Sequence, residues 1–173
     1  MNRIQKMSTS LLARKYEAKN PGLGYEYLKL HPNTEYPELW REVEKDKRFV
    51  KDKVITTAYA TFVALMHQTD ATTIGDFKYH DSGIGTGAED VGDVGLGTPW
   101  GGARDTGTQV ASTNTYTSVA TTTYNATKAI TEHGLFNASS GVTLMDRTKF
   151  AAINVVDTNA ITWTFVITFA TGG

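Results

Sequence analysis

Residues 161–169 give the strongest indication of the fold, and they read Ile161-Thr162-Trp163-Thr164-Phe165-Val166-Ile167-Thr168-Phe169. Each odd-numbered position holds a large apolar side chain, and three of the four even-numbered positions hold threonine. Side chains alternate across a β-strand, so this pattern predicts a strand with one buried face and one polar face. β-Branched and aromatic residues suit a half-buried pleated surface. Nothing in the stretch is typical of catalysis.

Working outward from this stretch, further β-strands are predicted at 77–80, 108–112, 116–126, 129–136, 142–146 and 148–156. Turn residues at 139–141 and 157–159 predict hairpins. Six or seven closely spaced strands make the chain mainly β and favour an antiparallel β-sandwich or a jelly-roll-like body. We expect its core to include Phe62, Leu135, Phe136, Phe150, Ile161, Trp163, Phe165, Ile167 and Phe169.

One helix is predicted over 54–68. Counting from Ile55, apolar side chains recur at i, i+4, i+7, i+8 and i+11, which is one face of a helix with 3.6 residues per turn. Such a face packs against a sheet. The helix and the strands together form a predicted body over residues 54–173.

Residues 1–53 differ from this body in charge. They hold twelve of the 17 Lys and Arg residues and eight of the 18 Asp and Glu residues, a local charge of +4 in a chain of net charge −1. Turn residues divide the segment, which predicts an extended arm with short helices near 8–16 and 38–48. Two alternatives stay open: the arm packs on its own domain, or it reaches a neighbouring subunit. Its predicted contact residues are aromatic: Tyr16, Tyr25, Tyr27, Tyr36, Trp40 and Phe49.

A glycine-rich, acidic segment over 81–107 predicts a long ordered loop. The run of glycines at 83–87 is followed neither by a helix nor by a Gly-Lys-Ser/Thr motif, so a structural turn is favoured over a phosphate site. The carboxylates at 81–93 match no EF-hand spacing, and whether they bind a metal ion stays open. We expect Trp100 and Arg104 to be the contact residues of this loop.

No residue pattern predicts catalysis. Glu132 and His133 are adjacent on a predicted strand, so their side chains point to opposite faces and cannot act as a pair. No Gly-x-Ser-x-Gly motif occurs, and no nucleophile has an identifiable base. Asp146 and Arg147 are interpreted as an ion pair that sets strand register or meets a neighbouring subunit. No catalytic, cofactor-binding or metal-binding residue is therefore assigned, and we do not expect an enzyme.

Composition narrows the remaining classes. The chain contains no cysteine, which excludes disulfides and thiolate metal sites. A net charge of −1 argues against general nucleic-acid binding. No apolar run approaches the roughly 20 residues of a membrane span, and no secretory signal is expected from the first ten residues.

Several groups of residues occur in order along the chain: Val54-Ile55-Thr56-Thr57-Ala58, Phe77-Lys78-Tyr79-His80-Asp81-Ser82-Gly83, Thr106-Gly107-Thr108-Gln109, Ile130-Thr131-Glu132-His133-Gly134-Leu135-Phe136, Leu144-Met145-Asp146-Arg147-Thr148, and a terminal strand ending at Gly172-Gly173. As a set they resemble a family of small virion-structural proteins encoded by tailed bacteriophages and prophages. The resemblance covers residues 54–173 and implies a non-enzymatic component of a phage particle.

The function expected on this resemblance is that of a capsid decoration (cement) protein. It would bind the shell of the major capsid protein at the virion surface, stabilise it, and form a homo-oligomer such as a trimer after synthesis in the cytoplasm of the bacterial host. The alternative is a structural protein of the tail, baseplate or fibre. A carbohydrate-binding or hydrolytic role is less favoured. It would need an exposed Trp100, or a catalytic pair formed by Glu132 and Asp146.

Overall fold

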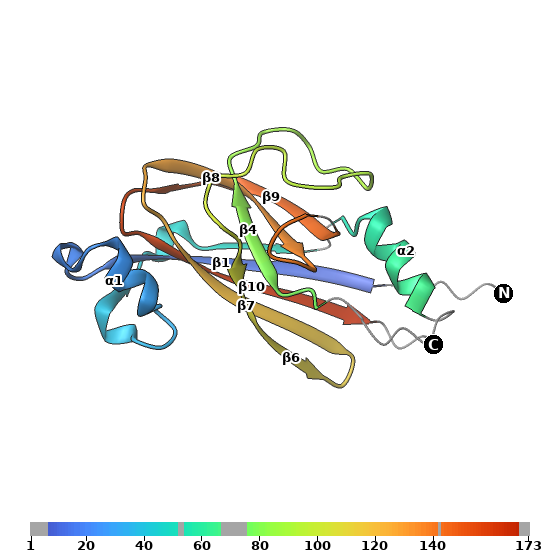
Figure 1. Cartoon of the computed structure of the whole chain (residues 1–173), viewed down its shortest axis with the longest axis horizontal. Coiled ribbons are helices and arrows are strands. Elements are labelled where there is room, and N and C mark those ends of the chain that lie inside the picture. Colours follow the sequence, from blue (N-terminus) through green and yellow to red (C-terminus); the bar gives the residue numbers. More distant parts are fainter. Residues whose placement is uncertain (1–6, 52–53, 67–75, 142, 170–173) are drawn as a thin grey trace.

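The computed structural model describes residues 7–51, 54–66, 76–141 and 143–169. Two antiparallel β-sheets, of six and four strands, pack against each other as an open sandwich (Figure 1). The prediction of a mainly β, antiparallel, sandwich-like fold is confirmed.

The larger sheet has the strand order β2-β1-β10-β7-β6, with β3 also paired to β1. Its strands are β1 (Met7–Ala18), β2 (Trp40–Glu42), β3 (Arg48–Lys51), β6 (Thr108–Ser112), β7 (Thr115–Thr123) and β10 (Ala160–Phe169). The smaller sheet has the order β5-β4-β8-β9. Its strands are β4 (Tyr79–Gly83), β5 (Asp105–Thr106), β8 (Lys128–Phe136) and β9 (Leu144–Val155).

The N-terminal segment is part of the fold and not a separate arm. Strand β1 pairs with β10 over ten residue pairs, from Met7–Phe169 to Tyr16–Ala160. The helix predicted near 8–16 is therefore wrong. Its odd-numbered side chains from Thr9 to Lys15 are buried, and Leu11 contributes to the core, so the segment has the period of two that a strand requires. The division at residue 53 does not match this arrangement.

The remainder of the N-terminal segment contains short elements. Helix α1 (Tyr25–Leu30) is accompanied by the 3-10 helices η1 (Pro21–Leu23), η2 (Pro37–Leu39) and η3 (Glu44–Asp46). The helix predicted near 38–48 is wrong, because this stretch holds η2, β2, η3 and the first residue of β3. Short helices do occur in the segment, as predicted, but at other positions.

The strands of the C-terminal half follow the prediction with two differences. One strand, β9, runs through both of the stretches predicted as separate strands at 142–146 and 148–156, although residue 142 lies outside the described residues. The turn at 157–159 is not a hairpin, because β9 lies in the smaller sheet and β10 in the larger one. The chain therefore changes sheets at this turn, where Thr158 has a positive φ of 68°.

Helix α2 (Thr57–Met66) confirms that a helix lies within the predicted stretch 54–68, but it begins only at Thr57: residues 54–56 precede it, and Ile55 forms an isolated β-bridge with Asp146. Residues 67 and 68 lie outside the described residues. Thr56 starts it: its hydroxyl accepts a hydrogen bond from Tyr59 N at 3.2 Å and itself donates to Leu144 O. A threonine in this place satisfies free N–H groups at the helix start. Tyr59 then packs with Phe77 and Phe165 on the core.

The core lies between the two sheets. The structure fully buries six of the residues expected there, namely Leu135, Phe136, Ile161, Trp163, Phe165 and Ile167, and it partly buries Phe62, Phe150 and Phe169. The alternation along β10 explains this, since its odd-numbered side chains all face the smaller sheet.

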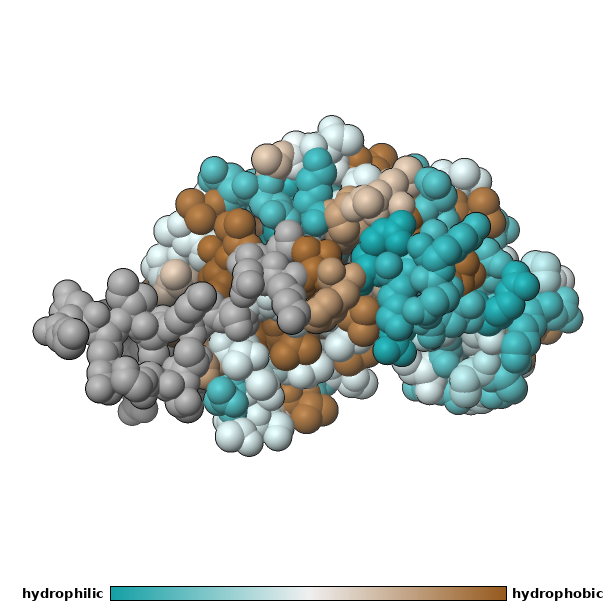
Figure 2. Space-filling model, turned by 180° about the vertical axis from the view of Figure 1, so that it is seen from behind, coloured by the Kyte–Doolittle hydropathy of each residue, from teal (hydrophilic) through white to brown (hydrophobic). Residues whose placement is uncertain are grey.

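The surface is uneven in hydropathy. In the view from behind, hydrophilic residues gather at the end of the molecule that carries α1, and apolar atoms lie in small groups elsewhere (Figure 2). Across the described residues, none of the helices has the length and apolar character needed to cross a bilayer.

Candidate functional site

The most densely hydrogen-bonded polar site lies where the glycine-rich loop crosses the smaller sheet. The register of β8 against β9 shifts between Ile130 and Glu132, where two steps along β8 match four steps along β9, from Ile153 to Lys149. Ile130 packs in the core, whereas Glu132, two residues later, lies under the loop. An irregularity of this kind interrupts the alternation of side chains that a regular strand pair would give.

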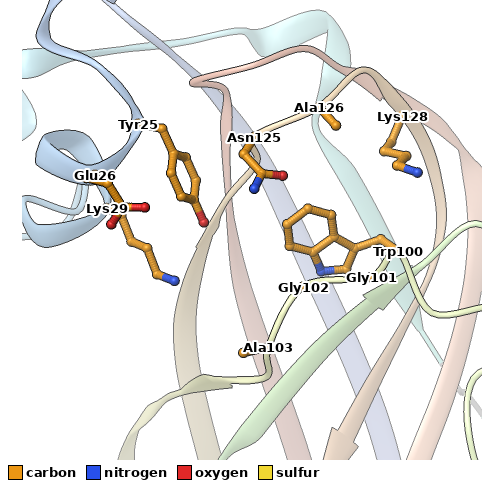
Figure 3. Close-up of a pocket in the computed structure, with 10 residues that line it drawn as sticks. All are labelled: Tyr25, Glu26, Lys29, Trp100, Gly101, Gly102, Ala103, Asn125, Ala126 and Lys128. Atoms are coloured by element: carbon orange, nitrogen blue, oxygen red, sulfur yellow. The ribbon is translucent and has the colours of Figure 1, made fainter.

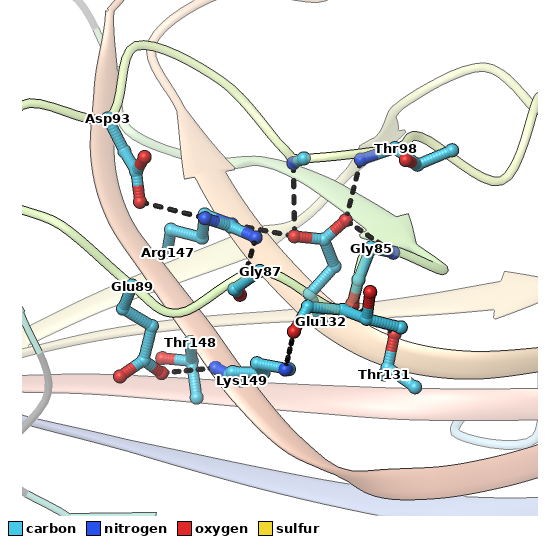
Figure 4. Close-up of polar contacts among 12 residues, drawn as sticks. Gly85, Gly87, Glu89, Asp93, Thr98, Thr131, Glu132, Arg147, Thr148 and Lys149 are labelled. Carbon is cyan, nitrogen blue, oxygen red and sulfur yellow. Dashed lines mark hydrogen bonds and ion pairs between the residues drawn. The ribbon is translucent and has the colours of Figure 1, made fainter.

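The carboxylate of Glu132 is buried and fully hydrogen-bonded (Figure 4). Its Oε1 accepts from the backbone N–H groups of Gly85 at 2.8 Å and Thr98 at 2.9 Å. Its Oε2 accepts from Gly97 N at 3.1 Å and from Arg147 Nε at 2.6 Å. Burial by itself raises the pKa of Glu132, but these donors together lower it below its ordinary value. The group is an anion with no remaining acceptor site for a substrate.

Arg147 completes the arrangement from strand β9. Its guanidinium also pairs with Asp93 at 3.0 Å and donates to the carbonyl oxygens of Ala88 and Gly87. We call Glu132, Arg147 and Asp93 the loop clamp. The interpretation of Asp146 and Arg147 as an ion pair is wrong, because Asp146 instead accepts hydrogen bonds from Thr9 and Thr148 on the opposite face.

The clamp explains the glycines of the loop. A Cβ atom on Gly85 would lie 2.3 Å from Oε1 of Glu132, and one on Gly97 would lie 2.7 Å from Nη2 of Arg147. Leu96 of the loop packs where a side chain on Gly134 of β8 would stand. The loop thus forms an outer layer on the smaller sheet.

Trp100 and Arg104 make their contacts inside the fold and are not available to bind a partner. Trp100 is only 7% exposed, and its ring packs edge-on against Tyr124 with 4.8 Å between centroids. The guanidinium of Arg104 lies 3.4 Å from the centre of the Phe136 ring and pairs with Asp81 at 3.5 Å. Both side chains attach the loop to the sandwich. The structure therefore does not support their predicted role as contact residues for a partner.

A polar pocket of about 440 Å³ opens between α1 and this loop (Figure 3). Tyr25, Lys29, Asn125 and Lys128 line it together with one edge of Trp100. Sugar binding requires an exposed aromatic face, whereas Tyr124 and Gly102 pack on the indole. The pocket has hydrogen-bonding groups but no nucleophile with a base among its lining residues.

The six aromatic residues predicted to make contacts lie in different surroundings. Trp40 is buried, and its indole N–H donates to His31 O at 3.0 Å. Tyr16 and Tyr25 are partly buried. Tyr27 and Tyr36 are exposed and flank the ring of His31, with centroids 4.1 Å and 4.7 Å away, and Phe49 on β3 is 58% exposed. Only the last three present substantial surface to a partner.

Two buried histidines link the sheets. Nδ1 of His80 lies 2.9 Å from Nε2 of His133, and Nε2 of His80 lies 2.8 Å from the Ser118 hydroxyl on β7. Burial lowers the pKa of His80 to about 3 and the pKa of His133 well below its ordinary value. Both rings are therefore neutral at pH 7, and they act as structural hydrogen-bonding groups.

The two strand carboxylates considered for glycoside hydrolysis do not form a site. Glu132 lies under the loop, whereas Asp146 is bonded to Thr9 of the other sheet, and both are buried. Hydrolysis needs two carboxyl groups that flank one accessible bond. Within the described ranges, no cluster of three or more His, Asp or Glu side chains is arranged to hold a metal ion.

Sequence reasoning did not find the loop clamp. The signal in the sequence was the spacing of Gly83, Gly85 and Gly97, which indicates close backbone approach but not the group approached. In the comparisons with known proteins, the chain matches no family model and no curated protein or solved structure.

Proposed function

We propose that this chain is a structural component of a tailed-phage virion, and specifically a capsid decoration protein that binds the shell of the major capsid protein. The observation that carries the proposal is the internal use of the charged and polar side chains. Glu132, Arg147 and the two buried histidines all bond within the fold. Side chains that bond within the fold make it rigid and are not available to act on a substrate. This arrangement suits a structural protein.

The described surface supplies features that suit binding to a shell. The end with α1 is hydrophilic (Figure 2), and it also presents two exposed aromatic residues, Tyr27 and Tyr36, together with the exposed aliphatic side chain of Leu30. Aromatic residues are enriched at the centres of protein interfaces. The body behind them is held by two sheets and the loop clamp, so contact residues would bind with little loss of conformational freedom.

Copy number tests this proposal. We expect quantitative mass spectrometry of purified virions to find the chain in a number comparable to that of the major capsid protein. A decoration protein must occupy repeated sites over the whole shell, and this sets the ratio. A few to tens of copies per particle would contradict the proposal and indicate a tail, baseplate or fibre component instead.

A further inference from the structure

The free edge of the larger sheet is formed by β6 (Thr108–Ser112). All five of its residues are exposed, Val110 by 63%, and β7 is its one neighbour within the part of the chain that the structure describes. Figure 1 places β6 at the lower margin of the molecule, at the end of a hairpin with β7. Alternate residues of such a strand direct their N–H and C=O groups away from the sheet, where another strand can accept them.

The edge has no charged residue to discourage such pairing. The chain is uncharged from Thr106 to Thr127, a span that includes both strands of the hairpin. Natural proteins commonly protect exposed edges with lysine, proline or a covering segment. β6 contains neither lysine nor proline.

In contrast to β6, strand β9 is an edge strand whose backbone is covered by other parts of the chain. β9 is the edge strand of the smaller sheet. The Glu89 carboxylate accepts the N–H of Lys149, and Thr56 N donates to Met145 O. The guanidinium of Arg48 donates to the carbonyl oxygens of Ala151 and Ala152. Other parts of the chain thus occupy outward backbone groups of β9. Among the described residues, the side-chain hydrogen bond to the β6 backbone comes from the Thr115 hydroxyl of its partner strand β7 to Ser112 O, and the outer side of β6 receives none.

The sequence of β6 suits pairing with itself. In an antiparallel pair centred on Val110, that residue faces its own copy, and Thr108 faces Ser112 on the same side of the sheet. Gln109 faces Ala111 on the other side, where its amide is already held by the Tyr116 hydroxyl at 2.6 Å. Cross-strand Thr–Ser and Val–Val pairs are favourable, and no like charges meet.

We propose that β6 is a homotypic interface, through which two copies of this chain pair antiparallel and join their larger sheets edge to edge. A two-fold contact of this kind uses the same surface on both subunits and closes at a dimer, in contrast to the trimer expected from the sequence. The contact is small, so we expect association that depends on concentration. It stands independently of the proposed function, because it concerns the isolated protein.

Sedimentation equilibrium of the purified full chain tests the interface. Val110→Lys places a charge at the centre of the pair and should weaken dimerisation by roughly tenfold or more. Val94→Lys is the matched control, since Val94 is also exposed, at 76%, but lies on the glycine-rich loop. Circular dichroism verifies that both variants fold. A wild-type chain that stays monomeric, or equal weakening by the two variants, would overturn the proposal.

The absence of cysteine allows a second test that does not weaken the edge. Val110→Cys introduces a single thiol, and two such thiols meet in the proposed pair. Under mild oxidation it should form a disulfide-linked dimer much faster than Val94→Cys. Equal rates would contradict the register. If the chain is monomeric but Val110→Lys abolishes binding to phage shells, the edge takes a strand of another protein, and self-pairing is wrong although the shell-binding function holds.

Discussion

Replacing Arg147 by methionine should lower the free energy of unfolding by about 3 to 5 kcal/mol. The change keeps much of the side-chain volume but leaves the Glu132 carboxylate buried without its cation. It also removes the donors that hold the carbonyl oxygens of Gly87 and Ala88. Chemical denaturation of the purified variant measures the loss.

Two further variants make this measurement specific. Arg41→Met breaks the Arg41–Glu17 pair, which has the same 2.6 Å separation as the clamp but lies at the surface, and it should cost less than about 1 kcal/mol. Glu132→Gln combined with Arg147→Met removes the buried charge and should recover part of the loss. A loss for Arg147→Met no larger than that for Arg41→Met would show that the clamp does not hold the fold.

Acid should destabilise the protein through its buried histidines. Burial lowers the pKa of His80 in the fold to about 3, whereas a histidine in the unfolded chain titrates near 6.5. Below about pH 6.5 the unfolded chain therefore binds a proton that the folded chain does not, and stability falls as the pH is lowered towards 3. Between pH 7 and about pH 5 His80 alone accounts for about 2 kcal/mol, and His133 acts in the same direction.

Asp105 opposes this effect. Burial raises its pKa to about 6, so the folded chain takes up a proton before the unfolded chain does, and this contributes stability as the pH falls through 6. A variant at position 80 separates the effect of His80 on the pH dependence of stability from that of Asp105. His80→Gln should reduce the fall in unfolding free energy between pH 7 and about pH 5 by about 2 kcal/mol. An unchanged fall in His80→Gln would refute the assignment.

The strands with strong alternation could be predicted from the sequence. β10 is the clearest case, because its apolar side chains are large and occur at every second position, so burial of one face is the dominant contribution. Helix α2 was predicted for the equivalent reason at a period of 3.6. For both elements, the period of the apolar side chains is enough to identify the type of secondary structure.

β1 could not be recognised in the same way. Its buried positions hold Thr9, Leu11, Ala13 and Lys15, of which only one is large and apolar. Lys15 is buried because Asp46 and Glu17 neutralise it at 3.2 Å and 3.4 Å. The strand is thus fixed by pairing with β10 and by the ion pair of Lys15 with Asp46, 31 residues further along the chain, neither of which the local pattern of β1 contains.

The loop clamp depends on still more distant features. At the register shift between β8 and β9, Glu132 lies on a different face from Ile130, although strict alternation would place both on the same face. Its partners Gly85 and Thr98 lie 47 and 34 residues away in the chain. Trp100, surrounded by glycines, was expected at the surface for the same reason, because the sequence does not reveal that the loop folds back on the sheet.

Amide hydrogen exchange of the wild-type protein measures whether the glycine-rich loop and the N-terminal strand β1 belong to one rigid frame with β10. The N–H groups of Gly85, Gly97 and Thr98 donate to a buried carboxylate, and those of β1 lie in the larger sheet. We predict that both sets exchange slowly, in the range of the β10 amides. Rapid exchange of the loop amides or of β1, at rates typical of an open segment, would contradict the account.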